Sequence, residues 1–428
     1  MFHFAEGIWL QRRRKQIGTM LLATAVVLFT ASLVVYPEQG FQAGIAGLKV
    51  FWDVVFPSLL PFFILSDLLL GLGVVNALGI FLEPLMRPLF SVPGVGAFAL
   101  SMGLAAGYPM DAVITAKFRR AGQCSRVEGE RMLAFTNTAD PLFMFGAVAV
   151  GMFKSPELGV LLAAAHYISA FVVGVTFKLY GRKEERYERP LREQRQRDTD
   201  SMLRRAYREM MTARERDGRP LGRLFGDAVN DSIKTLLMIG GFIMFFAVLL
   251  RVMAQVGLVG VMAVPLAALF EALHVNASLV SPFISGLFEI DIGSAASAVV
   301  SAPLIERLSV VSAIIAWSGL SVHAQVASVL TDTDIRIRPY FIARAYQAIV
   351  AAVATFFLYR AGLGASAAMV PRSVAAMAPL SAGAGAHWSM AFAALATWAA
   401  CLAVALCLSV LIHIIQKGRL SFFYSRSS

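Results

Sequence analysis

The chain has 428 residues, of which 58% are hydrophobic and only 15% are charged, and its mean hydropathy is +0.68. These values lie well outside the range of soluble globular proteins, and they predict an all-α polytopic membrane protein with the lipid bilayer as a partner. The formal net charge of +11 does not indicate nucleic-acid binding. Its basic residues gather in short segments between apolar runs, which is the pattern of the positive-inside rule.

The first elements are predicted to run out of the cytoplasm and back. Residues 12–15 (RRRK) precede an apolar stretch at 17–36 that is too long for a signal-peptide core, so we expect a retained first transmembrane helix with a cytoplasmic N-terminus. A short loop follows, and a second span at 54–74 returns the chain to the cytoplasm. Charges and prolines interrupt residues 75–92, which predicts a helix lying in the membrane interface.

The stretch GLAAGYPMDA at 103–112 interrupts the next apolar run with glycine, proline and aspartate. Proline and glycine disfavour a continuous helix, and an aspartate at the bilayer centre costs about 2.5–3.5 kcal/mol on insertion scales. Arg119 and Arg120 follow the run and would lie outside the cell if it crossed the membrane. We therefore predict that residues 94–118 form a re-entrant hairpin that enters from the cytoplasm and turns at Gly107–Pro109.

The rest of the chain repeats this plan after a charged linker. The first unit (51–180) ends with an outward crossing at 131–153, interrupted by TNTADP at 136–141, and a return at 157–180. Residues 181–223 predict a partly helical cytoplasmic linker. The second unit (224–360) contains a span at 233–250, a segment broken by Pro265, a hairpin at 281–304, a crossing at 310–330 and a span at 340–359.

The C-terminal part predicts one more crossing. Residues 361–387 form a Gly/Ala/Ser-rich external loop, and residues 388–428 a last transmembrane helix with a cytoplasmic tail. Together with residues 1–50, which hold the N-terminal tail and first helix, this gives about eight transmembrane helices and two re-entrant hairpins.

The two units predict an inverted repeat. SMGLAAGYP at 101–109 falls on ISGLFEIDI at 284–292, and each unit has three full crossings, an odd number that places its copy upside down. Interrupted hydrophobic segments at matching positions of inverted repeats indicate the site of a secondary transporter. Hairpin tips and unwound helix centres leave backbone groups unpaired, which hydrocarbon forbids unless they line a cavity.

The polar residues at these breaks are the candidate substrate-binding residues. An acid there could instead cap a helix or pair with a nearby base, such as Lys117 or Arg119 for Asp111, and His323 could be a packing residue. The candidates are Gly107, Tyr108, Pro109, Asp111, Thr136, Asn137, Thr138, Asp140, Glu289, Asp291, Ser318, Ser321, His323 and Gln325.

The chain lacks the sequence patterns of enzymes and metalloproteins. It contains no phosphate loop and no nucleophile with a matched base, and its three cysteines form neither a metal-ligand spacing nor a disulfide framework. We expect no catalytic residue, no metal site and no cofactor. The coupling ion, sodium or proton, stays open.

Several segments resemble the YlbJ family of sporulation integral membrane proteins, which carry two nucleoside-recognition Gate domains. The segments are FPSLLPFFILSDLL at 56–69, GYPM at 107–110, ERMLAFTNTADPLFMFGAVAVGMF at 130–153, GLFEI at 286–290, WSGLSVHAQVAS at 317–328 and DIRIRPYFIAR at 334–344. The resemblance implies a fold similar to concentrative nucleoside transporters, which are often trimeric, and a role in endospore formation. It implies transport of dipicolinate from the mother cell across the outer forespore membrane.

The chain departs from the family pattern at Asp111, Asp140 and Asp291, where small or neutral residues are usual. Added acids suit a cation, a proton or a neutral solute better than a bare dianion, unless protons or a calcium chelate neutralise them. A non-transporting sporulation scaffold or sensor, and a nucleoside or ion carrier unrelated to spores, are the alternatives to a dipicolinate transporter.

Overall fold

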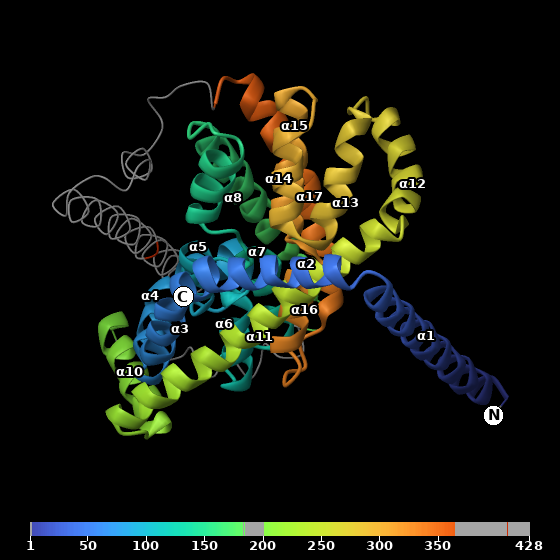
Figure 1. The fold of residues 1–428 in the computed structure, drawn as a ribbon. Coiled ribbons are helices and arrows are strands. Elements are labelled where there is room, and N and C mark those ends of the chain that lie inside the picture. Colours follow the sequence, from blue (N-terminus) through green and yellow to red (C-terminus); the bar gives the residue numbers. More distant parts are fainter. Residues whose placement is uncertain (1, 183, 185–200, 364–408, 410–428) are drawn as a thin grey trace.

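The structure, a computed structural model, describes residues 2–182, 184, 201–363 and 409, and this part of the chain is helical without strands (Figure 1). The first unit and the residues before it contain α1 (Phe2–Val35), α2 (Pro37–Val50), η1 (Phe51–Val55), α3 (Phe56–Gly71), α4 (Val74–Phe90), α5 (Gly96–Ala106), α6 (Met110–Arg120), α7 (Arg126–Thr136), η2 (Leu142–Met152) and α8 (Leu158–Phe177). The linker and second unit contain α10 (Met202–Asp217), α11 (Leu221–Gln255), α12 (Leu258–Ala272), η3 (Ala277–Leu279), α13 (Val280–Phe288), α14 (Ile290–Val299), α15 (Leu304–Trp317), α16 (Gly319–Val329) and α17 (Ile337–Arg360).

Five helical segments of the described chain are long and apolar enough to cross a membrane, or six if the bent pair α3 and α4 counts as one span. The five are Gln16–Val35, Leu158–Phe177, Leu221–Gln255, Leu304–Val329 and Ile337–Arg360. The prediction of an all-α polytopic membrane protein is therefore confirmed. The predicted total of about eight crossings includes a last helix, and almost all of residues 361–428 lie outside the described residues.

Three helix boundaries in the structure differ from the sequence-based expectations. The segment expected to be a loop after the first helix is helix α2, which packs along α11. A Cβ on Gly47 would lie only 3.0 Å from Met244 Cα, so glycine at this position lets the two helices approach closely. Helix α11 begins at Leu221, inside the predicted linker and before the expected start of the span. Pro265 does not end α12, which is continuous from Leu258 to Ala272, as membrane helices tolerate proline when neighbouring groups satisfy the freed carbonyl.

The two units are built from the same series of elements. A glycine with φ 75° and ψ 5° precedes α4 in the first unit and α12 in the second, namely Gly73 and Gly257. In each unit a short helical hairpin follows, α5–α6 or α13–α14. A helix broken near its centre comes next, α7 with η2 or α15 with α16. The last helices, α8 and α17, pack against each other.

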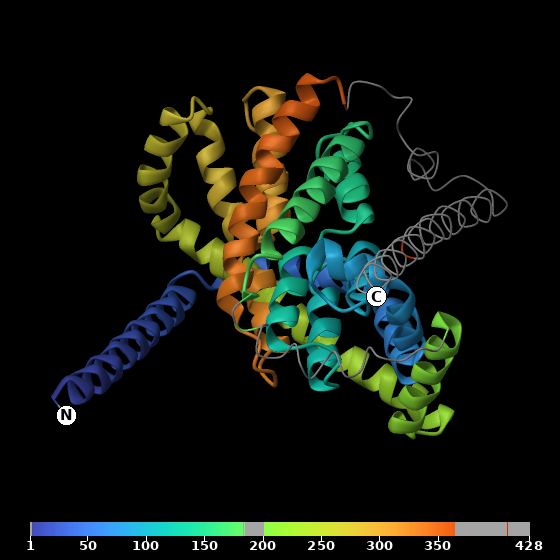
Figure 2. The same ribbon diagram turned by 180° about the vertical axis from the view of Figure 1, so that it is seen from behind.

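The two hairpins enter the helix bundle from opposite ends (Figures 1 and 2). The last turn of α6 is bound to the loop before α17, where Arg119 Nε donates to Asp334 Oδ1 at 2.7 Å. The open end of the other hairpin lies where α15 begins, since Arg307 Nε donates to Ser297 O at 3.0 Å. The Arg307 guanidinium also lies 5.2 Å from the ring of Phe153, at the end of η2. The direction of the bundle in a bilayer stays a prediction.

Part of the charged linker is folded against the first unit. Helix α10 packs on α3 and α4 (Figure 1), and its Met210 carbonyl oxygen lies 2.3 Å from where a Cβ on Gly73 would be. A cavity of about 1080 Å³ lies between α10, α4, α11 and the base of the first hairpin. This cavity is lined by charged residues and is separate from the residues predicted to bind substrate.

Candidate functional site

The first hairpin tip packs directly on the break between α7 and η2. Helix α5 ends at Ala106, Gly107 has φ 71°, and the Tyr108–Pro109 bond is cis. A Cβ on Gly103 would lie 2.2 Å from the Thr136 carbonyl oxygen, and one on Gly107 would lie 2.7 Å from Asp140 Oδ2. Only glycine therefore allows the tip to approach the break this closely.

The second tip packs on the second break in the same way. Helix α15 ends at Trp317, and both its C-cap Ser318 and Gly319, the first residue of α16, have positive φ. A Cβ on Gly319 would lie 3.0 Å from the Phe288 carbonyl oxygen and 3.3 Å from Glu289 Cα. Trp317 Nε1 donates to the Leu287 carbonyl at 3.0 Å. Each hairpin thus meets the broken helix of its own unit.

Asp111 lies at the centre of the first tip and is fully buried. Asn137 Nδ2 donates to its Oδ1 at 2.9 Å, and Thr136 Oγ1 donates to its Oδ2 at 3.1 Å. The alternative pairing with a base of α6 is wrong, because Lys117 binds Asp67 and Arg119 binds Asp334. The Asp111 carboxylate therefore accepts hydrogen bonds from the broken helix and forms no ion pair with Lys117 or Arg119.

Two residues of α17 extend this network across the repeat interface. Tyr340 OH donates to Asn137 Oδ1 at 2.9 Å and lies 3.3 Å from Ser318 Oγ, so it touches both breaks. The fully buried Arg344 donates through Nη1 to the Asn137 carbonyl at 2.5 Å and through Nη2 to the Ala134 carbonyl. These are carbonyls at the open end of α7, and a guanidinium is well suited to satisfy them. Sequence reasoning missed both residues, although an arginine inside the predicted span at 340–359 was a signal for Arg344.

Side chains also satisfy the unwound backbone of the first break. The Ala139 N–H donates to His166 Nε2 at 3.0 Å, and Tyr167 OH donates to the Ala139 carbonyl at 3.2 Å. Asp140 Oδ1 accepts from the Phe143 N–H at 2.9 Å and so caps η2. Asp140 is only half-buried, whereas Thr138 is fully buried beside it. His166 and Tyr167 of α8 were not predicted as site residues.

The second tip is less fully paired. Glu289 is buried, and its Oε2 has no hydrogen-bond partner. His323 Nδ1 bonds to the Gly319 carbonyl at 2.7 Å, and its ring lies 4.3 Å from the ring of Trp317. The remaining predicted residues of this half are the buried Ser321 and Gln325 of α16 and the half-buried Asp291 of α14.

Tyr108 joins the two halves of the site. Its hydroxyl donates to the Ile315 carbonyl at 2.6 Å, which ties the first tip to the second break. Its side chain also packs in one apolar cluster with Phe143 of η2, Ile290 of the second tip and Ile314 of α15. The structure thus brings both tips and both breaks together at one buried polar centre.

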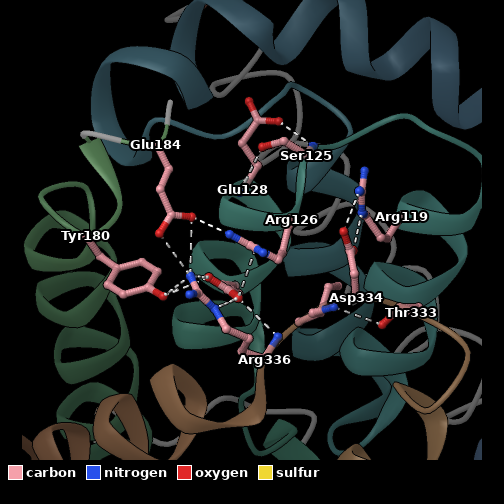
Figure 3. A network of polar contacts seen from close by, with 11 residues as sticks. Arg119, Ser125, Arg126, Glu128, Tyr180, Glu184, Thr333, Asp334 and Arg336 are labelled. Atoms are coloured by element: carbon pink, nitrogen blue, oxygen red, sulfur yellow. Dashed lines mark hydrogen bonds and ion pairs between the residues drawn. The ribbon is translucent and has the colours of Figure 1, made fainter. Parts of the chain in front are cut away.

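A group of ion pairs closes one end of the contact between the units (Figure 3). The buried Glu130, at the start of α7, accepts from Arg336 Nε and Tyr180 OH, both at 2.8 Å. Arg126 Nη2 donates to Glu184 at 2.5 Å. We call Glu130, Tyr180, Arg126, Glu184 and Arg336, with the pair Arg119 and Asp334, the end clamp.

The electrostatics of the end clamp follow from these contacts. Hydrogen bonding and the charge of Arg119 hold the pKa of Asp334 below its usual value, and Arg126 does the same for the pKa of Glu184. Burial and the bond to Glu130 raise the pKa of Tyr180 to about 12. At neutral pH Asp334 and Glu184 are therefore ionised beside Arg119 and Arg126, and Tyr180 is a neutral hydrogen-bond donor.

Metal binding gains no support from the described residues, since no three or more of their His, Cys, Asp and Glu side chains are grouped to hold an ion.

Apolar helices around two hairpins and two broken helices define the class of this protein: an all-α polytopic membrane protein with an internal repeat.

The comparisons with known proteins identify its family. The chain is 46% identical over 345 residues to the sporulation integral membrane protein YlbJ of Bacillus subtilis (strain 168), a match that covers 81% of this chain and 84% of that protein. The chain belongs to the YlbJ family of sporulation integral membrane proteins, which confirms the resemblance drawn from its segments. No family model and no solved structure matches it.

Proposed function

We propose that this protein is an alternating-access transporter of a small polar solute needed in endospore formation. The leading substrate is dipicolinate, moved from the mother cell toward the forespore across the outer forespore membrane, with both termini in the mother-cell cytoplasm. The relative in Bacillus subtilis supports the setting, since it is named a sporulation integral membrane protein. A homotrimer is the oligomeric state that the resemblance favours.

One observation carries the proposal: two folded-back tips and two broken helices meet at one buried polar centre. The tip contacts at Gly103 and Gly319 and the cross-repeat bond from Tyr340 to Asn137 define that centre. Unwound backbone and buried polar groups at membrane depth are costly and are found where they line a solute or ion pathway. A scaffold protein has no function that requires unwound backbone and buried polar groups at membrane depth.

The chemistry of the centre suits a planar dicarboxylate if its acids are neutralised. Arg344 brings a guanidinium to the repeat interface, and Asn137 and Tyr340 bring an amide and a hydroxyl, although in this structure these groups bond one another, Asp111 and the backbone. Asp111 and Glu289 would repel a bare dianion, so protons or a bound calcium ion must accompany it.

The test is solute counterflow in proteoliposomes loaded with unlabelled dipicolinate and given labelled dipicolinate outside. The wild type is expected to accumulate label, and Asn137→Ala to lose most of that activity because it breaks the bonds to Asp111 and Tyr340. Asn76→Ala is the matched control, since Asn76 on α4 makes one long bond, to Gln123 at 3.3 Å.

Two results would favour the alternatives. A wild type that moves no solute, together with an Asn137→Ala strain that sporulates normally, would support a scaffold or sensor. Counterflow of a nucleoside but not of dipicolinate would support a carrier of another class. Ligand-dependent thermal stabilisation by dipicolinate, its calcium complex, a nucleoside or sodium gives an independent measure, because a ligand that binds the folded state raises its stability.

A further inference from the structure

The carboxyl group at the second hairpin tip differs from the acids at the first tip. Glu289 lies between Phe288, the last residue of α13, and Ile290, the first residue of α14. It is 6% exposed, and its Oε2 has no hydrogen-bond partner. The rest of the carboxyl group is hydrogen-bonded by the Ser321 side chain and by the backbone of Ile290 and Asp291. It forms no ion pair with any residue in the described part of the chain.

The acids at the first tip have other uses. Both oxygens of Asp111 accept hydrogen bonds, from Asn137 and Thr136. Asp140 accepts from the Phe143 N–H and thereby caps η2. The two halves of the centre therefore match in backbone geometry but not in how their carboxyl groups are satisfied.

No group around the second tip supplies a neutralising charge. Asp291 on α14 is the charged group that acts on the Glu289 carboxyl. Nearby in the centre are His323 on α16, Tyr108 at the first tip, Asp140 before η2, and Tyr340 and Arg344 on α17, while Arg307 of α15 binds the Ser297 carbonyl at the far end of the hairpin. Asp291 has the same charge as Glu289. His323 bonds the Gly319 carbonyl, and Tyr108 and Arg344 donate to backbone carbonyls of α15 and of the first break.

An anionic carboxylate with one unpaired oxygen and a second acid beside it is strongly disfavoured in a buried setting, so Glu289 must be neutralised whenever the centre is closed. The described residues show no group of three or more acidic, histidine or cysteine side chains placed for a metal ion. A sodium ion held by backbone carbonyls is the competing coupling ion, and uptake driven by sodium at equal pH would reveal it. A proton needs only the carboxyl oxygen itself.

We propose that Glu289 carries the coupling proton, so that one proton and one solute cross together in the same direction. This inference rests on the proposed function and names its coupling ion. On the side where solute enters, an O–H bond forms on Oε2 with a proton from water. The neutral carboxyl then donates a hydrogen bond to a carboxylate of the solute, and on the other side the O–H bond breaks and the proton returns to water.

The experiment uses full-length protein in proteoliposomes with labelled dipicolinate outside and the membrane potential clamped at zero. The readout is the ratio of uptake with an acid-outside gradient of one pH unit to uptake at equal pH. A single coupled proton allows that ratio to rise to about tenfold in the wild type. Glu289→Gln is expected to lower the ratio to about one whatever its residual rate, because an amide cannot take up the proton.

Glu271→Gln, which changes an exposed glutamate of α12, is the matched control and is expected to keep the wild-type ratio. A Glu289→Gln ratio equal to the wild-type ratio, or uptake driven by sodium at equal pH, would overturn the proton assignment while leaving the transporter intact. A wild type that shows no counterflow would instead overturn the proposed function and this inference with it.

A second measurement does not depend on a variant that folds. Purified wild-type protein in weakly buffered detergent solution is expected to take up protons when dipicolinate is added, as read by a pH-indicator dye. Dipicolinate binding without proton uptake across the pH range of transport would overturn the proposal.

Discussion

The exchange Asn137→Ala tests whether the two repeats are joined through the first break. The Asn137 side chain is fully buried, donates to Asp111 at 2.9 Å and accepts from Tyr340 at 2.9 Å. Alanine removes both bonds, so it leaves a carboxyl oxygen and a phenol hydroxyl without that partner. It also removes a direct side-chain bond between the first unit and α17.

Two estimates bracket the effect on stability. Interhelical hydrogen bonds in membrane proteins contribute about 0.6 kcal/mol on average, so two ordinary bonds would contribute about 1 kcal/mol. Leaving a buried polar group unsatisfied costs about 1–3 kcal/mol, and more for a charged group. Because Asp111 and Tyr340 are both buried, the second case applies, and we expect a loss of about 3 kcal/mol in the free energy of unfolding.

The assay is reversible unfolding of the purified protein in mixed detergent micelles. A double-mutant cycle with Tyr340→Phe separates the cross-repeat bond from the bond to Asp111. Asn76→Ala is the control and is expected to lose less than about 1 kcal/mol, because its bond is long and half-exposed. An Asn137→Ala loss below about 1 kcal/mol, or no coupling to Tyr340→Phe, would refute the reasoning.

Three further predictions concern packing, a buried charge and pH. Gly103→Ala is expected to destabilise the protein by about 1–3 kcal/mol and to lower counterflow, because its Cβ would lie 2.2 Å from a backbone carbonyl oxygen of α7. Gly222→Ala, which has open space around it, is the control and is expected to be neutral in both assays. Arg344→Gln is expected to cost about 2–4 kcal/mol in chemical unfolding, since its guanidinium bonds two carbonyls at the end of α7; a near-neutral result would show that those carbonyls find other partners. Arg119 lowers the folded-state pKa of Asp334, so this pair stabilises the protein above the usual carboxyl pKa and loses that effect as the pH falls through the lowered value. Asp334→Asn is thus expected to lower the melting temperature at neutral pH and to match the wild type in strong acid. The loss of stability is expected to be at most about 1 kcal/mol, because the pair is exposed. A difference from the wild type that grows with acidity would contradict this sign.

Local signals were enough to place the tips and breaks. Glycine, proline and polar residues inside apolar runs, as in GLAAGYPMDA and TNTADP, cannot be part of a regular lipid-facing helix, so their positions are readable from the chain alone. The hairpins α5–α6 and α13–α14 lie at these positions. Helix ends were read less well, because hydropathy does not record the contacts they depend on: glycines bring α2 against α11, and Leu224 at the start of α11 packs against Gly71 of α3.

The partners of the candidate residues were not readable. Asn137 meets Tyr340 and Arg344, and Glu130 meets Arg336, across about 200 residues of chain. Nothing in the local pattern distinguishes an aspartate that pairs with Lys117 from one that binds the broken helix. Arg344 alone had a warning signal, its charge inside an apolar span.

The amino-acid sequence by itself determined the class of this protein, its repeat and the places where its helices must break, because those features depend on how each residue tolerates hydrocarbon and helical geometry. Only the tertiary structure decided which polar groups satisfy one another and which, like Glu289 Oε2, are left without a partner. Hydrogen bonds are short and directional, so they depend on the packing of elements from both units and not on the order of residues along one of them.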